Sequence, residues 1–167
     1  MNASKILIDG GILAIVMSAF FIGVGLYNMR LYLNKGDIPA DILAAVPPKT
    51  RAEKRLSILI GLPFLGLVLG FLLYSTVGFN HGVGGDASLG ALFVHAMGVL
   101  LIPFFVDLLI LDWLIFCTIT PSFAVYPGTE GFAGYKDYGF HLKAHARGIL
   151  LLIPTCAAVA WVAGHVR

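Results

Sequence analysis

Residues 56–77 read LSILIGLPFLGLVLGFLLYSTV, a run that contains no charged side chain. A helix needs about 20 apolar residues to cross the roughly 30 Å hydrocarbon core of a bilayer. A buried segment of a soluble domain is normally shorter, and it is amphipathic where it borders water. The run therefore predicts a membrane-spanning helix, and its length and apolar character are the standard for comparing the other segments.

Three further segments have the same character, at about residues 6–28, 89–118 and 137–164. Hydrophobic residues make up 59% of the 167 residues and charged residues only 12%, against roughly 25% charged in soluble proteins. We therefore expect an all-α polytopic membrane protein, a single membrane domain over 1–167 in which four transmembrane helices form an antiparallel bundle in the lipid bilayer.

Basic residues orient this bundle, because cytoplasmic connections of membrane proteins are enriched in Lys and Arg. The connections at 29–55 and 119–136, with the helix start that follows the second, hold nine of the eleven basic residues: Arg30, Lys35, Lys49, Arg51, Lys54, Arg55, Lys136, Lys143 and Arg147. We expect these connections in the cytoplasm, the glycine-rich turn at 78–88 outside, and an N-out/C-out arrangement. The predicted location is the plasma (inner) membrane of a prokaryote.

The first connection carries two local signals. Residues 38–46, IPADILAAV, predict a short interfacial helix that Pro47 and Pro48 end. Thr50 and Glu53 are spaced as a capping box, in which each side chain bonds to the other residue's backbone N–H. The second long helix is therefore expected to begin near Arg51, before it enters lipid.

Ionisable residues gather near the cytoplasmic ends of the third and fourth helices. Residues 135–147 read YKDYGFHLKAHAR, and residues 106–113 of the preceding helix read VDLLILDW. Counting about 1.5 Å of rise per residue from the opposite ends of the two helices, Asp107 is level with His145 and Asp112 is level with His141. Charged groups at the edge of a span are costly and usually functional.

The helical positions of these residues can also be predicted. Asp137, His141 and His145 are spaced by four and share one face of an α-helix, with the neighbouring Lys and Arg residues on the other side. Asp107 and Asp112 are five apart, which places them about 140° apart around an α-helix. We therefore expect that the two carboxylates do not both face one partner.

Three interpretations of this cluster stay open at the level of sequence. In the first, His141, His145 and one of Asp107 or Asp112 hold a metal such as Zn or Fe, and Glu130 or Asp137 transfers protons as a catalytic acid or base. In the second, the Asp and His side chains belong to a proton or ion pathway. In the third, they form a structural network or a partner interface.

The functional hypothesis that follows is metal-assisted chemistry on a lipid or lipid-soluble substrate. The alternative is a non-catalytic membrane subunit, or a small carrier or proton-handling component that works as a homo-oligomer or with a membrane partner. The net charge of only +2 offers no basic surface of the kind that nucleic acid requires, so no nucleic-acid partner is expected.

Two weaker features are also noted. Four residues near the external ends of the helices form a second candidate metal group: His81, Asp86, His95 and His165. Gly66 and Gly70 form a GxxxG motif, which favours close helix packing within the chain or, less strongly, between two chains.

Overall fold

The computed structural model describes residues 3–34 and 36–166, so Lys35 and Arg167 lie outside the described residues. The helices are α1 (Ala3–Asn28), α2 (Ala40–Ala45), α3 (Arg51–Gly82), α4 (Leu89–Val106) and α5 (Tyr138–His165). A π-helix, η2 (Asp107–Ile119), continues α4 without a break, and short 3-10 turns η1 (Met29–Tyr32), η3 (Ser122–Ala124) and η4 (Ala133–Lys136) lie in the connections. The described residues contain no strand.

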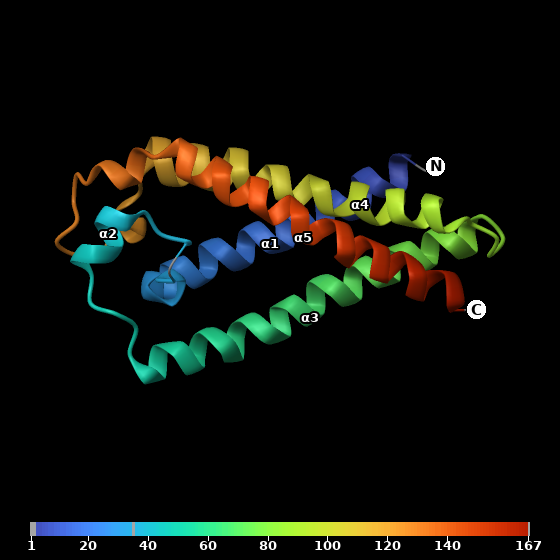
Figure 1. Cartoon of the computed structure of the whole chain (residues 1–167), viewed down its shortest axis with the longest axis horizontal. Helices are drawn as coiled ribbons and strands as arrows, with labels where there is room; N and C mark the ends of the chain where they lie inside the picture. Colours follow the sequence, from blue (N-terminus) through green and yellow to red (C-terminus); the bar gives the residue numbers. More distant parts are fainter. Residues whose placement is uncertain (1–2, 35, 167) are drawn as a thin grey trace.

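The long helices run antiparallel along one axis (Figure 1). Both termini and the turn between α3 and α4 lie at one end, and the two long connections lie together at the other. The all-α fold and the four spans predicted from the sequence are confirmed, because four helices are long and apolar enough to cross a membrane. Which end faces the cytoplasm stays a prediction from the distribution of basic residues.

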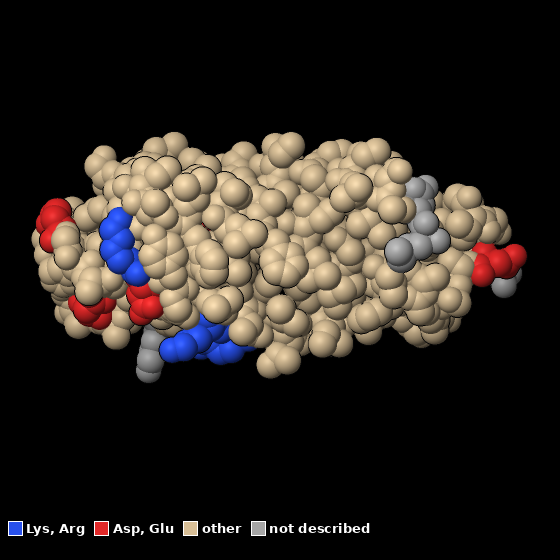
Figure 2. Space-filling model, turned by 90° about the horizontal axis from the view of Figure 1, so that it is seen from above, with Lys and Arg blue, Asp and Glu red and all other residues tan. Residues whose placement is uncertain are grey.

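The outer surface of the bundle is apolar along most of its length. Figure 2 shows Lys and Arg toward one end of one face and Asp and Glu near both ends, with uncharged surface between them. Large apolar side chains are exposed there, and Leu59, Leu150 and Leu151 each expose more than two thirds of their surface. Water would disfavour such a surface, whereas lipid tails solvate it, so the exposed residues support an integral membrane protein.

The core lies along α4, which contacts α1, α3 and α5. Leu13, Leu72, Val99 and Cys156 come from these four helices and pack in one cluster of buried side chains. Cys117 and Cys156 are both buried and unpaired. The helices are thus held by interdigitated apolar side chains, the main source of packing energy between helices in lipid.

The first connection is fixed to the start of α3 as the sequence predicts. Thr50 Oγ1 accepts a hydrogen bond from the Glu53 N–H, and a Glu53 carboxylate oxygen accepts one from the Thr50 N–H, which completes the capping box. The same carboxylate pairs with Arg30 of η1, the turn that follows α1. The helix start is therefore tied to its neighbour by charge as well as by backbone bonds.

The two long connections form a small core of their own. Leu33, Ile42 and Val46 of the first connection pack around Tyr126 of the second. The Tyr126 hydroxyl donates to the Met29 carbonyl at 3.0 Å, and burial raises the pKa of Tyr126, which keeps it a neutral donor. This core closes one end of the bundle.

The GxxxG motif does not pack within the chain. A methyl group added at Gly66 or Gly70 would meet no atom within 4 Å, and the positions are exposed on α3. The expectation of intramolecular packing there is wrong, because α3 turns this face away from the other helices.

Gly134 provides a test of how the connections are joined. Its N–H donates to Asp41 at 2.9 Å, and a methyl group at this position would overlap the Asp41 carboxylate and Pro39. We expect Gly134→Ala to destabilise the protein by about 1–3 kcal/mol, the usual cost of overpacking, measured as thermal unfolding in detergent. Gly61→Ala is the matched control, because Gly61 faces open space; equal stability of the two variants would contradict the close packing.

Candidate functional site

A change of helical geometry positions the acidic half of the site. The helix that begins as α4 becomes the π-helix η2 at Asp107, four residues after Pro103, and keeps that form to Ile119. In a π-helix each N–H bonds five residues back instead of four, as the Thr120 N–H does to Ile115 at 2.8 Å. Side chains five positions apart therefore stack on one face. Asp107 and Asp112 are five apart, and the expectation that they cannot share a partner is wrong for this reason.

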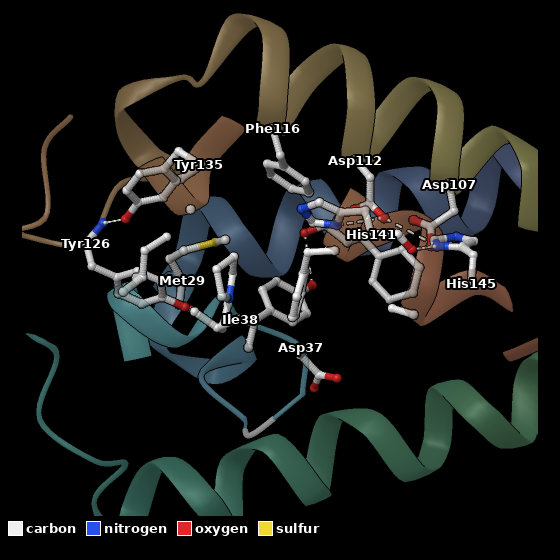
Figure 3. A pocket seen from close by; sticks show the side chains of 18 residues that line it. Met29, Asp37, Ile38, Asp107, Asp112, Phe116, Tyr126, Tyr135, His141 and His145 are labelled. Carbon is white, nitrogen blue, oxygen red and sulfur yellow. Dashed lines mark hydrogen bonds and ion pairs between the residues drawn. The ribbon is translucent and has the colours of Figure 1, made fainter. Parts of the chain in front are cut away.

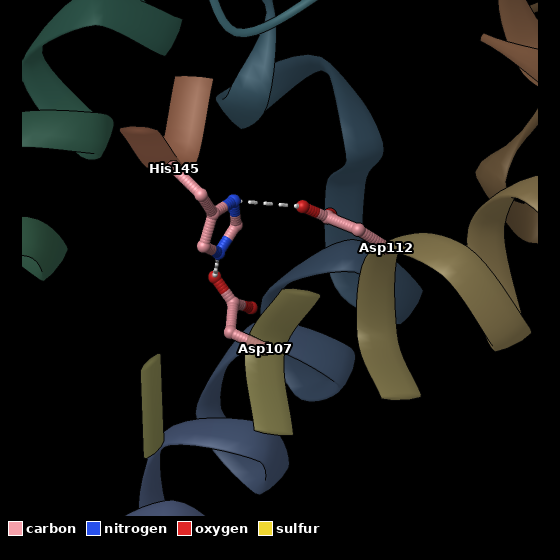
Figure 4. Close-up of side chains that lie close together, drawn as sticks. All are labelled: Asp107, Asp112 and His145. Carbon is pink, nitrogen blue, oxygen red and sulfur yellow. Dashed lines mark ion pairs between the residues drawn. The ribbon is translucent and has the colours of Figure 1, made fainter. Parts of the chain in front are cut away.

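His145 on α5 is the shared partner. Its Nε2 lies 3.3 Å from Oδ2 of Asp107, and its Nδ1 lies 3.5 Å from Oδ2 of Asp112. Figure 4 shows the imidazole between the two carboxylates, which come from successive turns of η2. His141, one turn earlier on α5, places Nδ1 3.0 Å from the same Asp112 oxygen. These contacts confirm the predicted depths, at which Asp107 is level with His145 and Asp112 is level with His141.

The backbone fixes which nitrogen of His145 carries a proton. Nδ1 lies 3.1 Å from the carbonyl oxygen of His141, and a carbonyl oxygen can only accept. Nδ1 must therefore be the N–H donor. The remaining atom, Nε2, faces Asp107, so either a proton or a cation must lie between this nitrogen and the carboxylate.

Charge balance leads to the same requirement. Two carboxylates lie together, and among the described residues no Lys or Arg forms an ion pair with either of them. The Asp112 and His145 side chains expose only 15% and 11% of their surface. Unbalanced negative charge in such a place is costly, so the cluster calls for protonated imidazoles or a bound cation.

Potential ligand atoms of Asp107, Asp112 and His145 all lie within 4.8 Å of one another. A tetrahedral zinc site and the two-histidine, one-carboxylate iron sites use these donor types. The three residues thus offer donor types that metal sites use, and His141 lies beside them against Asp112.

The cluster opens into a cavity of about 360 Å³. Figure 3 shows Asp107, Asp112, His141 and His145 gathered at one end of the cavity, with Asp37 apart from them on the first connection and mainly aromatic and apolar side chains along the rest. Its walls come from α1, η1, the first connection, η2, the second connection and α5, and they include Phe21, Met29, Tyr32, Ile38, Ile42, Phe116, Tyr126, Tyr135, Phe140 and Ala144. Ligand sites in proteins are typically of this size, mainly apolar with a few convergent polar groups.

Lys136 holds the far end of η2. Its ammonium donates to the carbonyls of Cys117 and Thr118, at 2.6 and 3.1 Å, and to the Thr120 hydroxyl at 2.7 Å. A cation at a helix C-terminus satisfies unpaired carbonyls and opposes the helix dipole. The acidic face of η2 is thereby anchored from the second connection.

Glu130 and Asp137 do not line this cavity. A Glu130 carboxylate oxygen accepts from the Gly128 N–H within its own turn, and Asp137 caps the start of α5 by accepting from the Phe140 N–H at 2.8 Å. Their assignment as proton-transfer groups stays a prediction. Both have local structural roles that explain their positions.

A second polar cluster, which the sequence analysis missed, lies near the opposite end of the bundle. The Ser75 hydroxyl donates to Asp9 at 2.5 Å and lies 3.0 Å from Nε2 of His95. Lys5 pairs with the same Asp9 oxygen at 2.7 Å. His95 is fully buried and stacked on Phe79, and its Nδ1 has no partner among the described residues. Asp9 and Ser75 lie 66 residues apart in the chain, so no local motif indicates their contact.

The proposed external metal group of His81, Asp86, His95 and His165 does not assemble around His95. His95 bonds to Ser75, and Nδ1 of His165 bonds to the Trp161 carbonyl of its own helix. Within the described ranges, Asp107, Asp112 and His145 form the only group of three or more His, Cys, Asp or Glu side chains close enough to share a metal ion.

No known protein family, curated protein or solved structure matches this chain. Its class is therefore defined by the fold and the site: an all-helical protein with four helices able to span a membrane and an Asp/Asp/His cluster at one end.

Proposed function

We propose that this protein binds a transition metal, zinc or iron, at the Asp107, Asp112, His141 and His145 cluster and uses it on a lipid-soluble ligand held in the adjoining cavity. The observation that carries the proposal is the position of His145, whose two ring nitrogens face two carboxylates from one helix face. A cation at Nε2 would satisfy both the tautomer and the charge of the site.

The cavity supports the second half of the proposal. Its walls are mostly aromatic and aliphatic, and four of its ionisable side chains, Asp107, Asp112, His141 and His145, converge at one end, apart from Asp37. A ligand with an apolar body and one polar group would place that group at the His and Asp side chains. Pairing of His141 with Asp112 beside the cavity supplies a group that can give or take a proton at that end.

The metal half of the proposal is tested on protein purified in detergent without chelator and loaded with Zn²⁺ or Co²⁺. We expect about one metal per chain in the wild type and a loss of at least tenfold in affinity in His141→Ala/His145→Ala, since removing ligands or their supporting partners costs this much. Elemental analysis after desalting measures the content. His81→Ala/His165→Ala removes two histidines from the other end of the bundle and should leave it unchanged.

Failure of the wild type to retain either metal, or equal retention by the two double variants, would contradict the metal site. The ligand half has its own variant, Ala144→Phe, which narrows the cavity without removing a ligand atom. It should retain metal and lose any lipid-soluble compound that copurifies with the wild type, as measured by mass spectrometry of an organic extract.

A second candidate function is proton handling, and the buried chain of Asp9, Ser75 and His95 favours it. The Ser75 hydroxyl donates its hydrogen bond to Asp9, so it accepts one from the imidazole of His95. These two bonds link the partly exposed Lys5–Asp9 pair to a fully buried imidazole. Polar groups that link a buried site to the surface are what a proton relay requires.

Proton flux into liposomes under an imposed potential tests this candidate. If the chain carries protons, wild-type vesicles acidify faster than empty ones, and Ser75→Ala and His95→Gln each slow the flux several-fold. Thr76→Val is the matched control, because Thr76 is equally buried but bonds to the Leu72 carbonyl of its own helix. Wild-type flux equal to that of empty vesicles would exclude the relay.

A further inference from the structure

The start of α3 combines exposed positive charge with exposed apolar surface. Arg51, Lys54 and Arg55 are all exposed in the first turns, and among the described residues none of them forms an ion pair. Spacings of three and four residues place them on one helix face. The same face continues with Ile58, Leu62 and Leu65, which expose 58%, 64% and 51% of their surface.

A second cavity lies against this face. It has a volume of about 570 Å³ and lies between the first connection and the start of α3. Leu33, Leu43 and Val46 supply apolar walls, and Lys54 and Ile58 of the α3 face also line it. The cavity is therefore continuous with the charged and apolar stripe of the helix.

The cavity also contains a buried cation. Lys49 is 9% exposed, and its three ammonium protons are used on neutral acceptors, the Leu31 carbonyl, Asn34 Oδ1 and the Ser57 hydroxyl. Burial lowers the pKa of Lys49, and the more distant Asp37 and Glu53 oppose that shift. Among the described residues no acidic side chain forms an ion pair with Lys49, so an anion in the cavity would further stabilise its charge.

We propose that this surface, Arg51, Lys54 and Arg55 with the apolar stripe and the Lys49 cavity, is a binding site for one anionic phospholipid. The phosphate lies at the cationic start of α3, where the helix dipole adds positive potential. The acyl chains lie along Ile58, Leu62 and Leu65. The sequence of charge followed by apolar surface along one helix face matches the order of groups in a phospholipid. This site is separate from the Asp and His cluster and does not depend on a metal there.

Native mass spectrometry of the full chain tests the site. The protein is reconstituted in nanodiscs of equal phosphatidylglycerol and phosphatidylcholine with identical acyl chains, and the lipids retained after transfer to mild detergent are counted. We expect about tenfold preference for phosphatidylglycerol in the wild type, reduced to near parity in Lys54→Gln/Arg55→Gln, since each basic residue near an anionic surface contributes a several-fold factor. Both side chains are exposed, so the variant keeps the fold.

Lys143→Gln/Arg147→Gln removes the same charge from α5 and is the matched control, expected to keep the wild-type preference. An equal loss in both double variants would overturn the proposal, because overall charge would then explain it. No preference in the wild type would also overturn it. A third arm adds excess glycerophosphoglycerol, the headgroup without acyl chains: we expect no displacement, and complete displacement would show a soluble-phosphate site instead of a lipid site.

Discussion

The contact of His145 with two carboxylates is the interaction on which the site depends. Each ring nitrogen lies within 3.5 Å of a carboxylate oxygen, and this is achieved only because η2 is a π-helix. The π geometry costs hydrogen-bond quality. It is maintained here by contacts at both ends: His141 and His145 hold its acidic face, and Lys136 holds its last carbonyls. The same group of polar contacts thus fixes the packing of α5, the position of the end of α4 and one end of the cavity.

Much of the fold follows from the sequence because the bilayer sets a length that apolar segments must match. The four spans, the capping box at Thr50 and the depth matching of Asp107 with His145 were predictable, since each rests on residue spacing along regular helices. The shared face of Asp107 and Asp112 was not, because nothing local to residues 107–119 distinguishes a π-helix from an α-helix, and the tertiary contacts decide between them. The Asp9–Ser75–His95 cluster was missed for a related reason: its members come from α1, α3 and α4, and only packing brings them together.

Acidic side chains are balanced by different groups at the two ends of the bundle. At the end with the termini, Lys5 forms an ion pair with Asp9. The Ser75 hydroxyl bonds to Asp9 and to the imidazole of His95. At the other end Asp107 and Asp112 have imidazoles but no Lys or Arg partner among the described residues. A neutral imidazole does not balance the negative charge of a carboxylate. A protonated imidazole does, or the imidazole and the carboxylate can both bind one metal ion. The mainly apolar cavity lies directly beside this second group, and Asp107, Asp112, His141 and His145 all line it.

The central claim, that the π-helix brings residues 107 and 112 to the same partner, is tested most directly by cysteine cross-linking. In a Cys117→Ala/Cys156→Ala background, Asp107→Cys/His145→Cys and Asp112→Cys/His145→Cys are each treated with one equivalent of Hg²⁺ in membranes, and bridging is read as the loss of both thiols, instead of one, to a thiol-reactive label. Glu130→Cys/His145→Cys serves as the negative control. If η2 is a π-helix, both aspartate positions bridge to position 145 and the control does not. Bridging from only one of the two positions, as an α-helix with the positions about 140° apart would give, would contradict it.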